Sequence, residues 1–535
     1  MRFSPPQQPT CERISENIRL ARAAKKLSQA GSPCKHWEFY VENLDQIRLG
    51  VVERDLKGIY PKEHQTKALG YLRQRVRRIF LQGSSLGGIA RFLSGEGASL
   101  TYVAPKEWRA TLSSLKVPVD ESSSSKKWFV KQKEEYKAGI LSVLKKIAFA
   151  CLGVGPKANG KSYALFVDVG ARAFTPNPPP EFKTKNLFSV LKEKPFFDCE
   201  IEEIWAIPKN VSSTDQISDP VKLVRSFFPR LPNIKARCLF VLQALKILGI
   251  VTVRWLSGHW WAPFFLRDAV DLAYVRHLPK HLRARDYIFH STIKTVRPVW
   301  TYEVEKTGSD ITCLLLSTHV GTIIPGQPQY PLVDLEYIGL NWSRYIVWNE
   351  KHTELLRRYG VQIERATAVG SIGISDRGRP IPKADKPIVA IFEVNPIHPA
   401  ASWQEAIPRP YYTLPITLAF LEQAMDAVVQ SGGIPFWKPK GRGHHHFHLF
   451  EAVQKKYSAV LLEDGISPYR LIDVASASIS MPFTTPGWIA ADVNKPAAYF
   501  DPTETLAGFD RYPPGCDLVL GKTALIKWLT AQLNS

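Results

Sequence analysis

The chain has 535 residues, of which 45% are hydrophobic and 22% are charged. This composition supports a large packed core and excludes wholesale disorder. The formal net charge of +21 favours an anionic partner, such as nucleic acid, an anionic membrane surface or a phosphorylated substrate.

The cysteine pattern and the N-terminus both favour a cytoplasmic location. The seven cysteines form no C-x-x-C pair, which argues against a disulfide framework or a zinc knuckle. The N-terminal sequence MRFSPPQQPTCERISENIRL lacks the apolar core of a signal peptide. No run of 18 or more uncharged apolar residues occurs, so no membrane-spanning helix is predicted.

Residues 1–150 are mixed and basic, and we predict that they form an N-terminal helical extension. The segments 35–56 and 126–153 have the spacing of amphipathic helices. DESSSSKK, residues 120–127, is predicted to be an exposed linker. PNPPPEFKTK, residues 176–185, is predicted to be a proline-rich loop.

GPKANGKS, residues 155–162, matches the G-x-x-x-x-G-K-S phosphate-binding loop letter for letter. That loop needs a strand before it and a helix after it. Here a helical pattern precedes the motif, and the strand-like YALFVDVG follows it. We therefore interpret the motif as a basic hairpin turn. A P-loop ATPase remains only as a less favoured alternative function.

CLFVLQALKILGIVTV, residues 238–253, is the nearest approach to a membrane segment. It contains a lysine and is too short to span a bilayer. The pattern predicts a buried helix–strand pair. The alternative is a helix on a membrane surface, which the following RWLSGHWWAPFF and the positive charge of the chain favour.

From about residue 286 the pattern becomes regular, with predicted strands at DYIFHST, DITCLLLST, RYIVWN and ATAVGSIGI. The helices between them, RPVWTYEVEKTG and EKHTELLRRYG, end at glycine. A second series of strands then follows, again with helices between them: KPIVAIFEVN, IPFWKPK, AVLLED, ASISMPF and PAAYFDP. KTALIKWLTAQLN closes the chain as a helix.

Strands that alternate with helices at this spacing predict parallel α/β sheets. We therefore predict an α/β fold in which two Rossmann-like domains, 151–385 and 386–535, face each other across a cleft. The extension 1–150 precedes them. Ligands of such sheets bind at the carboxyl ends of the strands.

Polar residues follow the predicted strands of the second domain. They are Asn395, His398, Lys438, Lys440, Arg442, Asp464, Ser480, Thr484 and Thr485. Cations, hydroxyls and a helix N-terminus at one edge would bind an anion, and the phosphate of a nucleotide is preferred. The alternatives are N-capping by Thr484 and Thr485, a solvated basic turn at KPKGR and a turn-capping role for Asp464.

HHHFH, residues 444–448, suggests a metal site at first sight. Three adjacent histidines on a regular helix cannot all point at one ion, and no nearby carboxylate or cysteine completes a ligand set. We expect structural or phosphate-facing histidines here and no metal.

RLIDVASASISMPFTTPGWIAADVNKPAAYFDPT, residues 470–503, resembles the signature of surface-polysaccharide biosynthesis proteins named for a Pro-Phe-Thr-Ser motif. Here the motif ends in Thr485 rather than serine, which keeps the hydroxyl. Further segments over residues 285–505 are similar to family segments: RPVWTYEVEKTGSDITCLLLST, YIVWNEKHTELL, AVGSIGISD, IFEVNP and FWKPKGR. His398-Pro399 resembles the His-Pro pair that some bacterial sialyl- and Kdo-transferases use on the nucleotide phosphate.

The resemblance implies a GT-B-like glycosyltransferase that moves a sugar from a nucleotide-sugar donor to a glycan acceptor, in O-antigen- or capsule-type polysaccharide biosynthesis. Lys438, Lys440, Arg442, Thr484 and Thr485, with His398 in a lesser role, would stabilise the leaving phosphate without a metal. Asp464 would contact the nucleoside. No cofactor other than the donor substrate is implied.

The base for the acceptor hydroxyl would come from the first domain, and His290, His319 and Glu303 all remain open. Acceptors of such enzymes are commonly lipid-linked, so the basic first half would hold the protein peripherally on the inner membrane face. Two alternatives also remain. One is a nucleic-acid-binding protein, which the charge and the 14 tryptophans permit but which is not expected. The other is a non-catalytic scaffold that keeps the fold.

Overall fold

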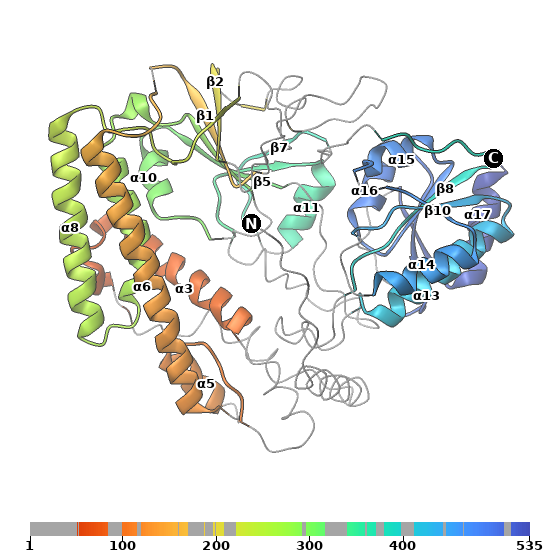
Figure 1. Cartoon of the computed structure of the whole chain (residues 1–535), viewed down its shortest axis with the longest axis horizontal. Coiled ribbons are helices and arrows are strands. Elements are labelled where there is room, and N and C mark those ends of the chain that lie inside the picture. Colours follow the sequence, from red (N-terminus) through yellow and green to blue (C-terminus); the bar gives the residue numbers. More distant parts are fainter. Residues whose placement is uncertain are drawn as a thin grey trace. The chain divides into compact units, whose positions relative to one another are not determined.

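The computed structural model of the chain describes residues 51–534 (Figure 1). The exceptions are 52, 84–98, 115–118, 159, 170–186, 188–195, 198–199, 208–220, 291–295, 316–339, 359–360, 371–378, 397–410, 442–445, 464 and 508–514. The chain forms two compact units: Met1–Ala148, Val241–Ala273 and Ile397–Pro410 in one, and Phe149–Phe240, Tyr274–Pro396 and Tyr411–Ser535 in the other. The division at residues 150 and 385 stays a prediction.

The first sheet has seven parallel strands in the order β3-β2-β1-β4-β5-β6-β7. The strands are β1 (Tyr163–Val167), β2 (Glu203–Ile207), β3 (Val221–Leu223), β4 (Asp286–His290), β5 (Asp310–Leu314), β6 (Arg344–Val347) and β7 (Ala366–Ala368). Two of its connections contain α10 (Trp300–Lys306) and α11 (Glu350–Arg358). Its central strands are short, nearly continuous apolar runs, as expected where both faces of a parallel sheet are covered.

The second sheet has six parallel strands in the order β10-β9-β8-β11-β12-β13. The strands are β8 (Ile388–Phe392), β9 (Ile434–Trp437), β10 (Val460–Leu461), β11 (Ala477–Ser480), β12 (Ala497–Asp501) and β13 (Asp517–Leu520). Its helices are α13 (Leu414–Gln430), α14 (Phe447–Lys456), α15 (Pro468–Val474), α16 (Thr485–Asp492) and α17 (Lys522–Leu533). Phe392 lies opposite Ser480, and Ser480 lies opposite Tyr499.

These two sheets confirm the predicted α/β class with two Rossmann-like parts. The segments predicted as strands and helices from 386 onward form those elements. The edge strand β13 was not predicted, because DLVL is short and its first residue, Asp517, is exposed. The predicted face-to-face arrangement across a cleft stays a prediction.

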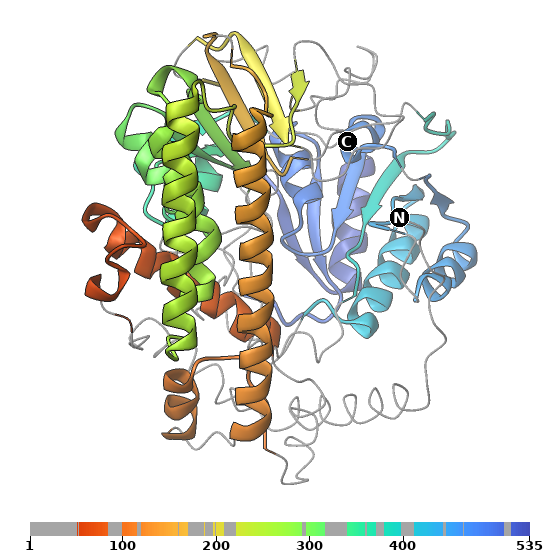
Figure 2. The same ribbon diagram turned by 60° about the vertical axis from the view of Figure 1, so that its left-hand side comes forward.

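The described N-terminal residues are helical, in keeping with the predicted extension. They form η1 (Glu53–Leu56), α3 (Lys62–Gly83), α5 (Lys106–Ser114) and most of α6 (Glu121–Leu152). The later helices α8 (Ile234–Leu256) and α9 (Ala262–His277) precede the short η4 (Lys280–Leu282). α6 and α8 lie side by side (Figures 1 and 2), where the Tyr136 hydroxyl is 2.5 Å from that of Thr252.

The predicted linker at 120–127 is wrong, because these residues begin helix α6. The Asp120 carboxylate accepts the backbone N–H of Ser123 at 2.9 Å, which caps the helix. The Ser124 hydroxyl is buried and accepts the Tyr102 N–H at 2.9 Å. Serine-rich sequence is typical of linkers. Here, however, Asp120 caps the helix and Ser124 is buried against Tyr102.

The predicted helix–strand pair at 238–253 is also wrong, since one continuous helix, α8, covers the segment. Its β-branched residues 250–253 favour a strand locally. A buried stripe at helical spacing nevertheless runs through both halves, from Phe240 and Ala244 to Ile247 and Val251. Tertiary packing therefore decides the helix over the local propensity.

The phosphate-loop-like segment 155–162 connects α6 to β1. A helix therefore precedes the motif and a strand follows it, as the sequence predicts. It is not the predicted hairpin turn, because β1 pairs in parallel with both neighbours, β2 and β4. Lys161 pairs with Glu203 at 3.8 Å. The predicted loop 176–185 lies outside the described residues, as does most of the predicted helix 35–56.

A buried ion pair links β4 to β6 of the first sheet across the strand between them, β5. Arg344 Nη1 lies 3.1 Å from Asp286 Oδ2, and both side chains are 1% exposed. The Thr312 hydroxyl donates to the other carboxylate oxygen at 2.8 Å, and Arg344 also donates to the Phe196 carbonyl. Burial raises the pKa of Asp286 to about 7, against the opposing effects of Thr312 and Arg344. The pair begins β4 and β6, at the amino end of the sheet.

Replacing Asp286 by alanine should lower the free energy of unfolding by about 3–5 kcal/mol, because it removes the buried carboxylate that balances the buried Arg344 charge. Urea unfolding followed by tryptophan fluorescence measures this. The matched control is Arg365→Ala, which removes an exposed pair to Asp310 at 3.0 Å and should cost less than about 1 kcal/mol. Equal losses in the two variants would contradict the assignment.

Candidate functional site

The strand order of the second sheet predicts a ligand site at the carboxyl ends of β8 and β11. Counting its strands along the chain, its order is 3-2-1-4-5-6, so the connections run in opposite directions from these two central strands. Where the order reverses, the loops after the two strands diverge and leave a crevice at their carboxyl ends. Phe392 and Ser480, which end β8 and β11, lie opposite each other in register. The residues that follow them form the candidate site.

Glu393 directly follows β8 and is buried. One carboxylate oxygen accepts the indole N–H of Trp437 at 2.6 Å, and the other accepts the backbone N–H of Lys440 at 2.8 Å. Burial raises the pKa of Glu393, while these two hydrogen bonds and the Lys438 charge oppose the shift. The carboxylate therefore fixes the loop after β9 against the end of β8. The sequence analysis missed Glu393, although an acid directly after an apolar strand is a visible signal.

The loop after β9 brings two of the predicted cations to this edge. Lys438 and Lys440 follow the last strand residue, Trp437. The Lys440 side chain is exposed overall, but protein atoms around its ammonium group partly desolvate it. This desolvation lowers the pKa of Lys440, and the Glu393 charge opposes the shift. The exposed Asn395 comes close to the same loop, since a Cβ added to Gly441 would lie 4.0 Å from its side-chain nitrogen.

The strand β11 supplies two buried hydroxyls. Ser478 and Ser480 are 1% and 0% exposed, and neither hydroxyl has a hydrogen-bond partner among the described residues. Alternation along a strand puts both on the same face of the sheet. A buried hydroxyl without a partner is unfavourable. Ser480 ends β11, so its unused donor and acceptor lie at the point of strand reversal.

The turn after β11 is held in an unusual conformation. Phe483 has φ of 58°, a left-handed value that is rare for a bulky residue. The Tyr412 hydroxyl donates to the Pro482 carbonyl at 2.7 Å, and the Tyr499 hydroxyl donates to the Thr484 carbonyl at 2.6 Å. Two tyrosines thus hold the strained turn, an arrangement typical of functional sites.

Gly487 lets helix α16 lie close to β12. A Cβ at this position would be 2.4 Å from the ring of Tyr499, far inside any normal contact. Tyr499 is fully buried and also bonds to the turn, so it cannot move aside without breaking that bond. Only glycine therefore fits at position 487, because of the same Tyr499 side chain that holds the turn.

The structure changes the expected roles of the two threonines. Thr484 occupies the N-cap position of α16 but makes no side-chain cap, because its hydroxyl donates to the Met481 carbonyl at 2.8 Å. Thr485 is the first helical residue and is half-buried. Pro486 has no N–H, and the N–H of Gly487 is bonded to Thr484. The first turn of α16 therefore offers fewer free donors than an open helix N-terminus.

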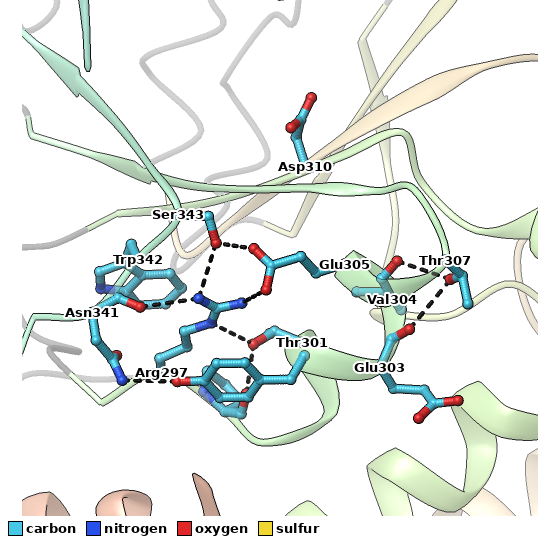
Figure 3. Close-up of polar contacts among 12 residues, drawn as sticks. Arg297, Thr301, Glu303, Val304, Glu305, Thr307, Asp310, Asn341, Trp342 and Ser343 are labelled. Carbon is cyan, nitrogen blue, oxygen red and sulfur yellow. Dashed lines mark hydrogen bonds and ion pairs between the residues drawn. The ribbon is translucent and has the colours of Figure 1, made fainter. Parts of the chain in front are cut away.

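The first sheet has the same kind of strand-order reversal, between β1 and β4. His290 ends β4 and is half-buried at this point. Glu303 lies instead on α10, where its carboxylate is 3.6 Å from the guanidinium of Arg276. In Figure 3 the Glu303 side chain points away from the polar network on the other side of its helix.

That network centres on Arg297, which is 5% exposed and makes four hydrogen bonds (Figure 3). It pairs with Glu305 at 2.5 Å and donates to Thr301 and Ser343, each at 3.0 Å. Its guanidinium also lies 3.8 Å from the ring centroid of Tyr302. A guanidinium used in this way fixes α10 against the segment that enters β6, with four of its five N–H donors occupied.

His352 is a second residue that the sequence analysis missed. It is fully buried in the first turn of α11, just beyond the carboxyl end of β6. The Trp348 N–H points at its Nδ1 at 3.4 Å, and its Nε2 has no partner among the described residues. Burial lowers the pKa of His352 to about 4. Its ring centroid is 6.1 Å from that of Trp488 on α16 in the same compact unit.

The other predicted site residues, His319, His398, Arg442 and Asp464, lie outside the described residues. The same holds for His444 and His445, while His446 lies just before α14. The structure thus brings Asn395, Lys438, Lys440 and Ser480 to the carboxyl edge of one sheet and places His290 at that of the other.

Two doubly wound parallel sheets with polar loops at the point of strand reversal define an α/β protein of the Rossmann-like type. Within this class, the sequence model of the "polysaccharide biosynthesis PFTS motif protein" family matches residues 242–529, more than half of the chain. The chain belongs to this family. The matched region contains the strained Pro482-Phe483-Thr484-Thr485 turn, Glu393 and His352.

Several solved structures have a general likeness to the chain at low identity. The wall teichoic acid polymerase TagF has 10% identity and a TM-score of 0.36, over 76% of this chain and 90% of that one. The lipopolysaccharide outer core galactosyltransferase WaaB has 12% identity and a TM-score of 0.32, over 70% and 90%. MurG of Acinetobacter baumannii has 10% identity and a TM-score of 0.28, over 70% and 93%.

TM-scores of this size carry no conclusion about function. Among curated proteins, none matches the chain.

Gly487→Ala should lower the free energy of unfolding by about 1–3 kcal/mol, because the added methyl overlaps the Tyr499 ring. Chemical unfolding measures the loss. Gly70→Ala, in the interior of α3 where a Cβ meets nothing within 4 Å, is the control and should stabilise by about 0.5–1 kcal/mol. A Gly487→Ala protein as stable as the wild type would disprove the close-packing argument.

His352 should make the protein less stable in acid. Its pKa is about 4 in the folded state against 6.5 normally, so the unfolded chain binds the proton first as the pH falls. The contribution of His352 to stability should therefore decrease between pH 6.5 and pH 4, by up to about 3 kcal/mol. Urea unfolding at several pH values should show a smaller pH dependence for His352→Gln.

The control for this experiment is His448→Gln, which changes an exposed histidine on α14. It should leave the pH dependence of the wild type unchanged. If His352→Gln has the same pH dependence as the wild type, another group causes the acid sensitivity.

Proposed function

We propose that this protein is a glycosyltransferase that moves a sugar from a nucleotide-sugar donor to a hydroxyl of a glycan acceptor in surface polysaccharide biosynthesis. One observation carries the proposal: in a member of a polysaccharide biosynthesis family, Lys438, Lys440, Asn395 and Ser480 lie at the strand-reversal edge of a doubly wound sheet. This is where open α/β sheets bind nucleotides.

The two lysines suit the phosphates of the donor. As the bond from the sugar to the phosphate breaks, negative charge grows on the leaving nucleotide. Lysine ammonium groups fixed beside that phosphate stabilise the charge more in the transition state than in the bound substrate. Arg442 and His398 are proposed to add to this cationic group. Because the chain supplies the positive charge, the proposed reaction uses no metal.

Glu393 is proposed as a positioning residue rather than as a base. Both of its oxygens are occupied, by the Trp437 indole and the Lys440 backbone N–H. It therefore holds the cationic loop in one place before the donor arrives, and its negative charge balances the lysines while the site is empty. A preorganised loop needs little rearrangement on binding, which favours both affinity and rate.

Ser480 and Asn395 are proposed to bind the neutral part of the donor. The Ser480 hydroxyl is buried without a partner among the described residues, so a donor oxygen would satisfy it. The Asn395 amide is exposed beside the loop of Lys440 and can both donate and accept a hydrogen bond. Asp464 is proposed to contact the nucleoside.

Among the described candidates for the base, His290 suits the role best. It ends the strand β4 at the reversal point of the first sheet, and imidazole titrates near neutral pH. Glu303 is engaged with Arg276 on a helix away from the strand ends. His319 follows β5 and is retained as the second candidate.

Donor binding can be tested by thermal shift and calorimetry with UDP, CMP and GDP and their sugar conjugates. We expect one nucleotide class to raise the unfolding temperature of the wild type. Lys438→Ala and Lys440→Ala should each weaken its binding about tenfold or more, because each removes a charged hydrogen bond to phosphate. Donor hydrolysis or transfer should fall in parallel.

The matched control is Lys527→Ala, an exposed lysine on α17. It removes the same charge from the same sheet unit and should bind the nucleotide as the wild type does. The proposal fails if no nucleotide stabilises the protein, or if both site variants bind as tightly as the control.

A further inference from the structure

Helix α8 is apolar on two opposite faces. Its buried face consists of Phe240, Ala244, Ile247 and Val251. The opposite face carries large apolar side chains that are exposed, among them Leu242 at 65%, Leu245 at 49% and Leu256 at 77%. Only 22% of its most apolar 18-residue stretch is buried. Helices that are apolar all round are normally buried in protein or in a membrane.

Helix α6 extends this exposed surface. Leu141 and Leu144 on α6 are 59% and 52% exposed. The two helices pack antiparallel, because Gln132 accepts the Trp255 indole N–H at 3.1 Å, while Tyr136, one turn later on α6, lies 2.5 Å from Thr252, one turn earlier on α8. This register brings Leu144 level with Leu245.

Helical periodicity puts the exposed leucines of each helix opposite its own buried stripe. They therefore form one outer surface, the α6–α8 apolar face. It consists of Leu141, Leu144, Leu242, Leu245, Val253 and Leu256.

The charges around this face are mostly positive, and the exposed Glu134 of α6 is paired with Lys131 at 3.3 Å. α8 contains no acidic residue, and Lys235, Lys246 and Arg254 are spread along it, the two lysines being exposed. On α6, the exposed Lys137 and Lys145 lie in the same stretch as the leucines. At the C-terminal end of α8, the indoles of Trp255 and Trp260 are half-buried, which suits side chains at a membrane–water interface.

We propose that the α6–α8 apolar face docks on an anionic lipid bilayer, with the leucines in the acyl boundary and the lysines against the headgroups. The combination of an apolar stripe and a cationic border is the chemistry that binds such surfaces. A second copy of the chain fits less well, because two copies of the same cationic border would repel each other.

α8 is also the helix, among the described residues, that is long and apolar enough to cross a membrane. Its buried stripe argues for lying on the surface, because Phe240, Ala244, Ile247 and Val251 pack against the protein and are not available to lipid. The protein would then be a peripheral protein of the inner membrane face. Docking does not depend on the proposed transfer reaction, although it would bring the site to a lipid-linked acceptor.

Vesicle co-sedimentation of the full chain tests this proposal. The wild type should sediment with vesicles of phosphatidylcholine and phosphatidylglycerol and bind pure phosphatidylcholine weakly. Leu242→Glu/Leu245→Glu should weaken binding to the anionic vesicles about tenfold or more, since it removes two apolar anchors and adds two negative charges. Lys235→Gln/Lys246→Gln should weaken binding less and reduce its salt dependence.

The matched control is Val429→Glu/Val493→Glu, which places the same charges on exposed valines next to the second sheet. It should sediment like the wild type. Equal sedimentation of the leucine variant and this control would overturn the proposal. Wild type that resists extraction by high salt and carbonate would overturn surface docking in favour of a spanning helix.

Two further measurements keep the outcome distinct from a folding defect and from the proposed function. Circular dichroism and nucleotide-induced thermal shift of the leucine variant should match those of the wild type. If light scattering shows instead that the leucine substitutions split a dimer and leave vesicle binding intact, the face is an interface between two copies and the lipid proposal is wrong.

Discussion

The proposed donor site depends on the buried carboxylate of Glu393. It joins the ends of β8 and β9 by accepting the Trp437 indole and the Lys440 backbone N–H. A carboxylate buried without such donors would be very unfavourable. The loop after β9 is therefore restricted to conformations in which both hydrogen bonds to Glu393 form. The position of the cationic loop is therefore set by the buried carboxylate of Glu393.

The family motif performs a mechanical task in the same sheet. Phe483 takes a left-handed conformation, Tyr412 and Tyr499 hold the carbonyls on either side of it, and Gly487 admits the Tyr499 ring. Thr484 and Thr485 begin α16 without a side-chain cap at the N-cap position. We infer that the motif shapes the crevice through the backbone of its turn more than through direct hydroxyl contacts with a phosphate.

The helical part and the sheets use apolar residues differently. In the sheets, apolar runs are covered on both sides, and the unusual features are polar groups left inside, such as Ser480 and His352. In α6 and α8 the unusual feature is the reverse, apolar side chains left outside and bordered by lysines. Both features leave an interaction unsatisfied. We propose a nucleotide sugar as the partner of Ser480 and a lipid surface as the partner of α6 and α8.

The sequence alone determined the parallel α/β class, the strands and helices of the second sheet apart from β13, and the strand-end positions of Asn395, Lys438, Lys440 and Ser480. Local periodicity and the rule that parallel strands share a carboxyl edge are sufficient for this. Only the tertiary structure decided that α8 is one helix, that residues 120–127 begin α6, and that Glu393 and His352 are buried at strand ends. These features arise from contacts between residues far apart in the chain, such as Glu393 with Lys440, which local sequence patterns do not encode.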